Sequence, residues 1–469
     1  MSAHTATAAG APGEAATPRA PTRALVGWVL FDWAAQPFYT LVLTFLFAPY
    51  FADVVVGDKV RGQAIWGYAA AAAGVLIAIG SPLLGAVADG QGRRKPWVFV
   101  CGLVLAGGAA LLWWAIPAAN AYTLTLVLIA FVAAWVAAEF CTVFVNSMMP
   151  TLVPRNELGR LSGIGWGVGY AGGLVSLVVM AGFIVANPAT GKTFLGLNPI
   201  LALDAGAREG DRLVGPFAAV WFLIFVVPFF LFVPDIRAST ARPSQKSAFA
   251  ELVSTIRALP DHPDMMLFLI ARMLYADGLA AIFAFGGLYG SAVFDWSQFE
   301  LGLFAIVLTM TGAVGAVFGG VLDDRIGAKK VIVTALLILL AGALGILSVT
   351  KEWIFFSVAV APKAAGSGPF SSTGEHVFLG FAMMVALVAA PVQASSRSLL
   401  ARLAPAEKMA QFFGLFAFSG KATAFLAPFL VAAVTAMTGS HRASMAVIAG
   451  FLIAGLLLIL PVREQGRIR

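Results

Sequence analysis

Long apolar runs constrain this chain more than any other feature. Roughly twelve runs occur, each near the ~20 residues that an α-helix needs to cross a bilayer. Hydrophobic residues make up 60% of the 469-residue chain and charged residues only 11%. A water-soluble protein of this length could not cover its surface with so few charges. The runs therefore predict an all-α membrane protein.

A charged segment between apolar runs occurs twice. The first copy reads GAVADGQGRRK from Gly85, and the second reads GVLDDRIGAKK from Gly320. Aligned without gaps, the copies match Asp89 with Asp324, Gly92 with Gly327 and Lys95 with Lys330. The segments before the fifth and eleventh runs also correspond, matching Pro154 with Pro405 and Gly163 with Gly414. Both repeats predict a duplication into two pseudo-symmetric halves of six helices each.

Polar segments divide the chain into five parts. We expect a disordered tail at 1–22, a six-helix bundle at 23–233, a partly helical linker at 234–263, a second six-helix bundle at 264–462 and a short tail at 463–469. The first tail is rich in Ala, Pro and Thr, a composition that does not form a packed core. It has no short apolar core before a cleavage site, so we expect no cleaved signal peptide.

Basic residues are unevenly distributed among the predicted loops. Most of the 30 Lys and Arg residues fall in the two tails, the linker and every second loop. The positive-inside rule then predicts that both termini are cytoplasmic, and we expect the inner membrane of a bacterium. The formal charge of +7 does not indicate a nucleic-acid partner, because the basic residues do not share one soluble face.

Several ionisable side chains fall inside the predicted spans. They are Asp32, Glu139, Arg272, Asp277, Arg397 and Lys421. Burying such a charge near the bilayer centre costs about 2.5 kcal/mol or more unless it is paired or hydrated. The set predicts a water-accessible central cavity, in which an acid can exchange a proton and a cation can bind an anionic group. The alternative is a set of static ion pairs, such as Asp32 with Arg272, that only clamp the halves.

Longer segments around these residues resemble a known family. They are Phe31-Asp32-Trp33-Ala34, Leu274-Tyr275-Ala276-Asp277-Gly278, the stretch 393–405 (QASSRSLLARLAP), Phe412-Phe413-Gly414 and Ser419-Gly420-Lys421-Ala422. With the two charged loops, they resemble the vacuole effluxer-like branch of the major facilitator superfamily of transporters. The resemblance covers nearly the whole chain. It departs at Ala276, where that branch often has Asn, and at Gly90, where many relatives have a basic residue.

The resemblance implies a secondary active transporter with twelve transmembrane helices. Alternating access would move a small polar solute, an amino acid or similar zwitterion, with proton coupling in symport or antiport. The candidate proton-coupling residues are Asp32, Glu139 and Asp277. The candidate substrate-binding residues are Arg272 and Lys421, for a carboxylate, and Gln36, Tyr39, Tyr275, Gln393, Ser395, Ser419 and Thr423.

The charged loops have a mechanical interpretation. Glycines let a neighbouring helix approach closely, and an acid at a helix end can engage an arginine or the N-terminus of a facing helix. The resemblance implies a conformational latch that closes the cytoplasmic face. The candidate latch residues are Gly85, Asp89, Gly92, Arg93, Arg94, Gly320, Asp324, Arg325, Gly327 and Arg397. Simple positive-inside anchoring by the basic residues is the alternative.

Other classes of function lack sequence support. No Gly-rich phosphate loop, nucleophile elbow or zinc motif occurs, so we expect no enzyme, no metal and no cofactor. Cys101 and Cys141 lie inside predicted helices, where a buried thiol needs no function. The expected partners are a small-molecule substrate, protons and the lipid bilayer, with the protein a monomer. A permease for peptides or cell-wall fragments and a transport-dead receptor or scaffold stay open, as do substrate identity and the direction of transport.

Overall fold

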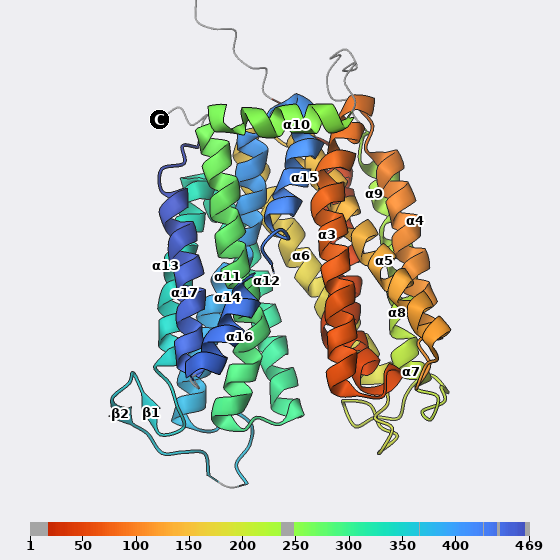
Figure 1. Ribbon diagram of the computed structural model, residues 1–469, viewed down its shortest axis with the longest axis vertical. Helices are drawn as coiled ribbons and strands as arrows, with labels where there is room; N and C mark the ends of the chain where they lie inside the picture. The colour runs from red at the N-terminus through yellow and green to blue at the C-terminus, as the bar shows by residue number, and fades with distance from the viewer. Residues whose placement is uncertain (1–16, 236–247, 365, 425, 439–440, 465–469) are drawn as a thin grey trace, which may run out of the picture.

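The computed structural model describes residues 17–235, 248–364, 366–424, 426–438 and 441–464. Most of the predicted first tail, part of the linker and the last residues of the second tail lie outside these ranges. Within them the chain is helical except for loops and one short β-hairpin. Figure 1 shows two groups of helices side by side, one from each half of the chain.

The N-terminal half contains elements α1 to α9. They are α1 (Thr22–Pro37), α2 (Phe47–Tyr50), α3 (Lys59–Gln91), α4 (Lys95–Leu111), α5 (Ala121–Met148), α6 (Leu158–Val179), α7 (Glu209–Arg212), α8 (Val214–Phe225) and α9 (Val227–Phe232). Short π-helical segments at Phe38–Phe45 and Phe51–Val55 extend α1 into one span, and another at Met180–Ile184 extends α6.

The linker and the C-terminal half contain α10 to α17. They are α10 (Ala248–Ala258), α11 (Pro263–Phe294), α12 (Gln298–Ile326), α13 (Ala328–Leu347), α14 (Thr373–Leu403), α15 (Met409–Ser419), α16 (Leu426–Thr438) and α17 (His441–Ile459). Strands β1 (Trp353–Ile354) and β2 (Val358–Ala359) pair antiparallel between α13 and α14, with Trp353 opposite Ala359.

The predicted fold class is confirmed. In the described ranges, 10 helical segments are long and apolar enough to cross a membrane. One expected run departs from an uninterrupted span: the predicted eleventh helix breaks into α15 and α16.

The break after α15 lies directly beside Arg272. Gly420 follows the last residue of α15, and a Cβ placed on it would lie 2.8 Å from the Arg272 guanidinium. The chain there makes turns instead of continuing the helix. Irregular backbone at membrane depth is tolerated where it lines a cavity or is buried in protein, so this break marks a place to look for a site.

Two pairs of helices form the seam between the halves: α3 packs along α15, and α6 packs along α12. Glycines permit the close approach. A Cβ on Gly320 would lie 2.6 Å from the Gly159 carbonyl oxygen, and Gly85 abuts the backbone of Ala410. Gly163 and Gly414, which the sequence repeat matches, both abut backbone of the opposite half. The repeated glycines therefore serve equivalent contacts.

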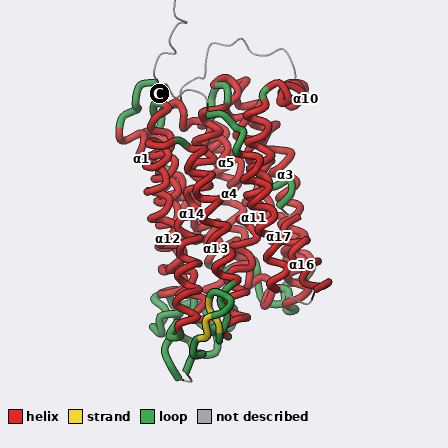
Figure 2. The backbone as a smooth tube through the Cα atoms, turned by 90° about the vertical axis from the view of Figure 1, so that its left-hand side faces the viewer, coloured by secondary structure: helices red, strands yellow, loops and turns green. Residues whose placement is uncertain are grey.

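The molecule has two distinct ends. Helices run along its long axis and the loops gather at the ends (Figure 2). We call the end that carries α10 the tail end, at the top of Figure 1, and the end that carries α7 and the β-hairpin the loop end.

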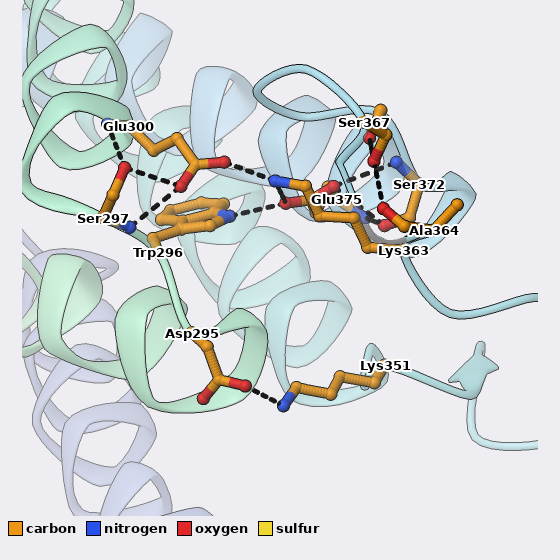
Figure 3. A network of polar contacts seen from close by, with 11 residues as sticks. Asp295, Trp296, Ser297, Glu300, Lys351, Lys363, Ala364, Ser367, Ser372 and Glu375 are labelled. Carbon is orange, nitrogen blue, oxygen red and sulfur yellow. Dashed lines mark hydrogen bonds and ion pairs between the residues drawn. The ribbon is translucent and has the colours of Figure 1, made fainter.

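A polar cluster organises the loop end of the C-terminal half (Figure 3). Helices α12 and α14 each begin with a capping box, Ser297 with Glu300 and Ser372 with Glu375. Lys363, from the loop before α14, donates to both glutamates. The Trp296 indole also donates to Glu375 at 2.9 Å. One lysine therefore ties the N-termini of two spanning helices together.

Candidate functional site: a charged cavity at the seam

A cavity of about 430 Å³ lies between the two halves. Both halves line it. Among its lining residues are Asp32, Gln36, Tyr39, Glu139, Asn146, Trp166 and Tyr170 from the N-terminal half and Arg272, Ala276, Gln393, Arg397, Phe416 and Lys421 from the C-terminal half. Ligand pockets typically measure roughly 300–1,000 Å³, so this cavity has room for a small solute.

Helical spacing explains which residues reach the cavity. Asp32 and Gln36 on α1, and Tyr39 in the π-helical segment that extends it, follow one another at intervals of four and three, which places them on one face. On α11 the intervals from Arg272 to Ala276 and from Ala276 to Ala280 are both four. The structure thus brings together most of the predicted charges, with the exception of Asp277.

Two ion pairs cross the seam inside this cavity. Arg397 on α14 pairs with Asp32 on α1 at 3.3 Å. Lys421, in the break after α15, pairs with Glu139 on α5 at 3.1 Å and lies over the Trp135 ring. The pairing of Asp32 with Arg272, considered from the sequence, is not the one observed. Each pair joins opposite halves, so any separation of the halves must break it.

Arg397 is the more deeply held of the two cations. Its guanidinium donates to the hydroxyl and carbonyl oxygens of Ser162 and, at 3.0 Å, to Asn146. It also lies over the Trp28 ring. A Cβ on Gly165 would come within 2.6 Å of the Asp32 carboxylate and 2.9 Å of Arg397. That glycine therefore makes room for the pair.

Arg272 is a cation of a different kind. It donates to the Phe416 carbonyl oxygen at 2.6 Å and to the Ser419 hydroxyl at 2.8 Å, and it stacks on the Phe416 ring. No carboxylate of the described residues lies within ion-pair distance of it. Its charge faces the cavity without a carboxylate of the described residues in direct contact, which suits it to an anionic group.

Asp277 lies behind the cavity wall. Its side chain is 1% exposed and does not line the cavity. Neither carboxylate oxygen accepts a well-formed hydrogen bond from the described residues. The Thr423 hydroxyl and the Arg272 guanidinium are polar groups that interact with it. A fully buried charge without a partner is costly, so this position suits a carboxyl group that gains and loses a proton.

Four of the predicted substrate-binding residues do not line the cavity. Tyr275 shares a hydrogen bond with Ser396 inside the C-terminal half. Ser395 is fully buried and Ser419 supports Arg272, while Thr423 lies beside Asp277. These residues form the layer behind the cavity wall.

The two charged loops hold the halves together at the tail end. Asp89, at the end of α3, accepts hydrogen bonds from the Ala410 and Gln411 amides at the start of α15. Asp324, near the end of α12, accepts from the Gly159 and Arg160 amides at the start of α6, at 2.8 and 3.0 Å. An anion at a helix N-terminus is favoured by the unpaired amides and the helix dipole.

The other predicted latch residues divide into two groups. Arg94 is buried and pairs with Asp89 at 2.9 Å, and Gly92 and Gly327 supply the positive φ angles of the two turns. Arg93 and Arg325 are exposed, and no contact of their side chains is observed within the described ranges. Positive-inside anchoring suits these two arginines better than latching.

The sequence did not single out Arg402, which joins several polar groups at the tail end. Arg402 pairs with Asp323 at 2.6 Å, with Glu464 at 2.7 Å and with Asp324 at 3.5 Å, and it donates to the Arg155 carbonyl of the other half. Its place five residues after Arg397, within the stretch quoted for the resemblance, was the available signal.

Two acids that follow the last helix of each half were also missed. Asp235 accepts from the amides of Arg94 and Lys95 at the start of α4. Glu464 accepts from the amides of Ala328 and Lys329 at the start of α13. Both acids follow a valine by two residues, which was the sequence signal.

Two helical halves, a charged cavity at their seam and two charged loops that bridge the halves at one end are the features of a transporter of the major facilitator type. The fold is similar to that of FucP, a transporter of this superfamily in its outward conformation, with a TM-score of 0.67 over 95% of this chain and 99% of that one, at 15% identity. It is also similar to the proton:xylose symporter XylE, with a TM-score of 0.66 over 94% of this chain and 95% of that one, at 14% identity.

Within that class, the chain belongs to the vacuole effluxer Atg22 like family, whose model matches residues 51–468. It is 23% identical over 445 residues to the uncharacterized MFS-type transporter YxiO of Bacillus subtilis, covering 93% of this chain and 94% of that protein. It is 26% identical over 320 residues to autophagy-related protein 22 of Cryptococcus neoformans, covering 66% of this chain and 52% of the fungal protein. The match therefore spans about half of that fungal relative.

Proposed function

We propose that this protein is a secondary active transporter that moves a small zwitterionic solute of the amino-acid class across the membrane, coupled to a proton. The observation that carries the proposal is the cavity at the seam, which presents charges of both signs from both halves. Membership of the effluxer family supports the same conclusion.

The Glu139–Lys421 pair suggests how a zwitterion is recognised. A solute carboxylate binds Lys421, with Arg272 as the second cation of the cavity, and its ammonium group binds Glu139 or Asp32. The solute thus replaces one ion pair across the seam with two pairs to itself. A solute of a single charge would leave one of the protein groups unpaired, which is costly at low dielectric.

The latches suggest how access alternates. The polar contacts that join the halves at Asp89, Asp324 and Arg402 all lie on the tail side of the cavity. This structure is therefore closed toward the tail end, which the positive-inside rule assigns to the cytoplasm. Rocking of the halves would break these contacts and open the cavity toward the cytoplasm.

We assign proton coupling to the acids in and behind the cavity, namely Asp32, Glu139 and Asp277. Asp32 and Glu139 line the cavity and are paired, so a proton on either one would release its cation. Asp277 is buried without an ion pair among the described residues, so protonation there would remove a charge that the fold does not balance. Proton movement and the opening of the seam would then be linked.

A small solute fits better than the larger alternative. The cavity of about 430 Å³ is lined by Trp166, Tyr170 and Phe416 among others, and a volume of this size leaves little space for a peptide chain or a cell-wall fragment. A transport-dead receptor is disfavoured because both latch loops and the charges of both halves form complete contacts.

Solute flux tests the proposal directly. The protein is reconstituted into proteoliposomes, and a panel of labelled amino acids, sugars and monocarboxylates is measured in counterflow. We expect saturable exchange of at least one amino acid, at least tenfold weaker in Lys421→Gln. The matched control is Lys351→Gln, which removes a lysine from an exposed ion pair at the loop end. Exchange of uncharged solutes alone would contradict the zwitterion assignment.

A second measurement tests coupling. Asp32→Asn and Asp277→Asn are compared with the parent protein in uptake driven by a pH jump and in counterflow. We expect both variants to lose accumulation, and at least one of them to keep exchange. If both accumulate solute as well as the parent protein, coupling through these acids is wrong.

A further inference from the structure

A second cavity, of about 400 Å³, lies between α1 and α6 near the tail end. Its walls are apolar: Leu25, Val29 and Leu30 come from α1, and Ile164 and Val168 come from α6. The central cavity does not share any of these residues. We call this second cavity the α1/α6 groove.

The groove opens away from the central cavity. Successive residues of an α-helix are about 100° apart around its axis. On α6 the groove residues Ile164 and Val168 therefore lie on nearly the opposite face from Trp166 and Tyr170, which line the central cavity. Val26, on the groove side of α1, is 49% exposed. The groove thus belongs to the outer surface of a membrane-spanning bundle.

The surroundings determine what can fill such a groove. Water does not stably fill a groove with apolar walls. Within the membrane, lipid acyl chains lie against the outer surface of the bundle and can occupy such a groove. From Thr22 to Leu30 on α1, and from Arg160 to Val168 on α6, the walls extend eight residues, or about 12 Å. That depth accommodates the upper part of one acyl chain.

The mouth of the groove carries positive charge. Arg19 and Arg160 lie at its tail end, beside Glu157. Glu157 pairs with Arg19 at 3.4 Å, while no carboxylate of the described residues pairs with the Arg160 side chain. Arg23, one residue into α1, is exposed nearby in sequence. The charge balance at the mouth therefore favours an anionic headgroup.

We propose that the α1/α6 groove is a binding site for an anionic phospholipid, with its phosphate at Arg160 and Arg19 and one acyl chain between α1 and α6. Phosphate is recognised well by arginine, whose N–H groups match its oxygens. The Arg160 amide also donates to Asp324 of the latch, so the lipid binds directly beside the closed seam. This site is independent of the transported solute.

Photo-crosslinking in lipid nanodiscs tests the site. The full chain is reconstituted with a trace of phosphatidylglycerol, or of phosphatidylcholine, that carries a diazirine in one acyl chain, and labelled peptides are mapped by mass spectrometry. We expect phosphatidylglycerol to label the segments around Val29 and Ile164, and phosphatidylcholine to label them at least tenfold less. Equal labelling by the two lipids would overturn the proposal.

Variants of the mouth and of the wall separate charge from shape. A basic residue at the membrane surface contributes roughly fivefold to the affinity for anionic lipid, so Arg19→Gln/Arg160→Gln should lose about 30-fold. The matched control, Arg257→Gln/Lys330→Gln, removes two exposed basic residues elsewhere on the tail end and should label like the parent protein. Equal loss in both double variants would show only a general surface charge effect and would overturn the site.

A third variant fills the groove. Val29→Trp should abolish labelling of the α6 segment while an unchanged elution volume and thermal transition show that the protein is folded. Labelling that persists in a folded Val29→Trp protein would place the acyl chain elsewhere and overturn the proposal.

Discussion

Asp324→Asn is the sharpest test of the latch. The substitution keeps the shape of the side chain and one acceptor oxygen, but it removes the negative charge that faces the α6 N-terminus. Asp324 joins the halves through the Gly159 and Arg160 amides at 2.8 and 3.0 Å. Its neighbour Arg402 keeps Asp323 and Glu464 as partners, so no buried cation is left alone.

The magnitude follows from the local geometry. A carboxylate at a helix N-terminus contributes up to about 2 kcal/mol in a partly buried site, and the side chain of Asp324 is only 16% exposed. Loss of about 1–2 kcal/mol from the closed seam corresponds to a shift of about 5–30-fold toward the state that is open at the tail end. Asp89→Asn is a poorer choice, because Arg94 is buried and pairs with that carboxylate.

Distances between spin labels measure the shift. Labels on Asn156→Cys and Ala406→Cys lie in opposite halves, at exposed positions of the tail end that precede α6 and α15. We expect a second, longer distance population in Asp324→Asn. The control is Asp295→Asn, which removes an acid from an exposed pair within the C-terminal half. A distance distribution identical to that of the parent protein would refute the latch reasoning.

Three further perturbations have defined outcomes. Gly165→Val should lower the thermal transition temperature and reduce solute binding, because a Cβ there already meets the Asp32–Arg397 pair and overpacking costs about 1–3 kcal/mol. The control Gly107→Val, which places its side chain in open space, should change little. Equal effects of the two substitutions would contradict this expectation. In a double-mutant cycle of thermal unfolding, Lys421→Ala should cost about 1–3 kcal/mol because Glu139 is left unpaired, and Lys421→Ala/Glu139→Ala should cost less than the sum of the single changes. Additive costs would show that the pair is not coupled. Lys363→Gln should lower stability at neutral pH: the two glutamates raise the pKa of the Lys363 ammonium, so its contribution is complete below pH ~10.4 and is lost only as pH rises above that value. A thermal difference from the parent that falls between pH 7 and 9 would contradict the assignment.

The predictions that held concern depth and repetition. The apolar runs and the duplicated loops predicted a two-half major facilitator fold, and the repeated glycines Gly163 and Gly414 occupy equivalent seam contacts. Depth along the spans also brought most of the charges to one cavity. These features depend on residue order along one helix, which a sequence displays directly.

The predictions that differed concern the direction of side chains around a helix. Asp277 has the predicted depth, but the residue of α11 that faces the cavity at that depth is its neighbour Ala276. Successive helical residues are about 100° apart, so the Asp277 side chain is turned about 100° away from the cavity-facing row. The break after α15 likewise turns Lys421 toward Glu139, whereas an uninterrupted helix was expected. Small rotations of this kind decide whether a charge lines the cavity or supports its wall.

By itself, the sequence determined that the chain crosses a membrane many times, that it is duplicated, and that charges lie at mid-depth, because hydrophobicity and repeats are properties of a single strand of residues. Only the tertiary structure decided the partners. Asp32 pairs with Arg397, far along the chain, and Arg402 joins Asp323 to Glu464. Ion pairs across the seam depend on how separately folded helices pack, and no local pattern encodes that geometry.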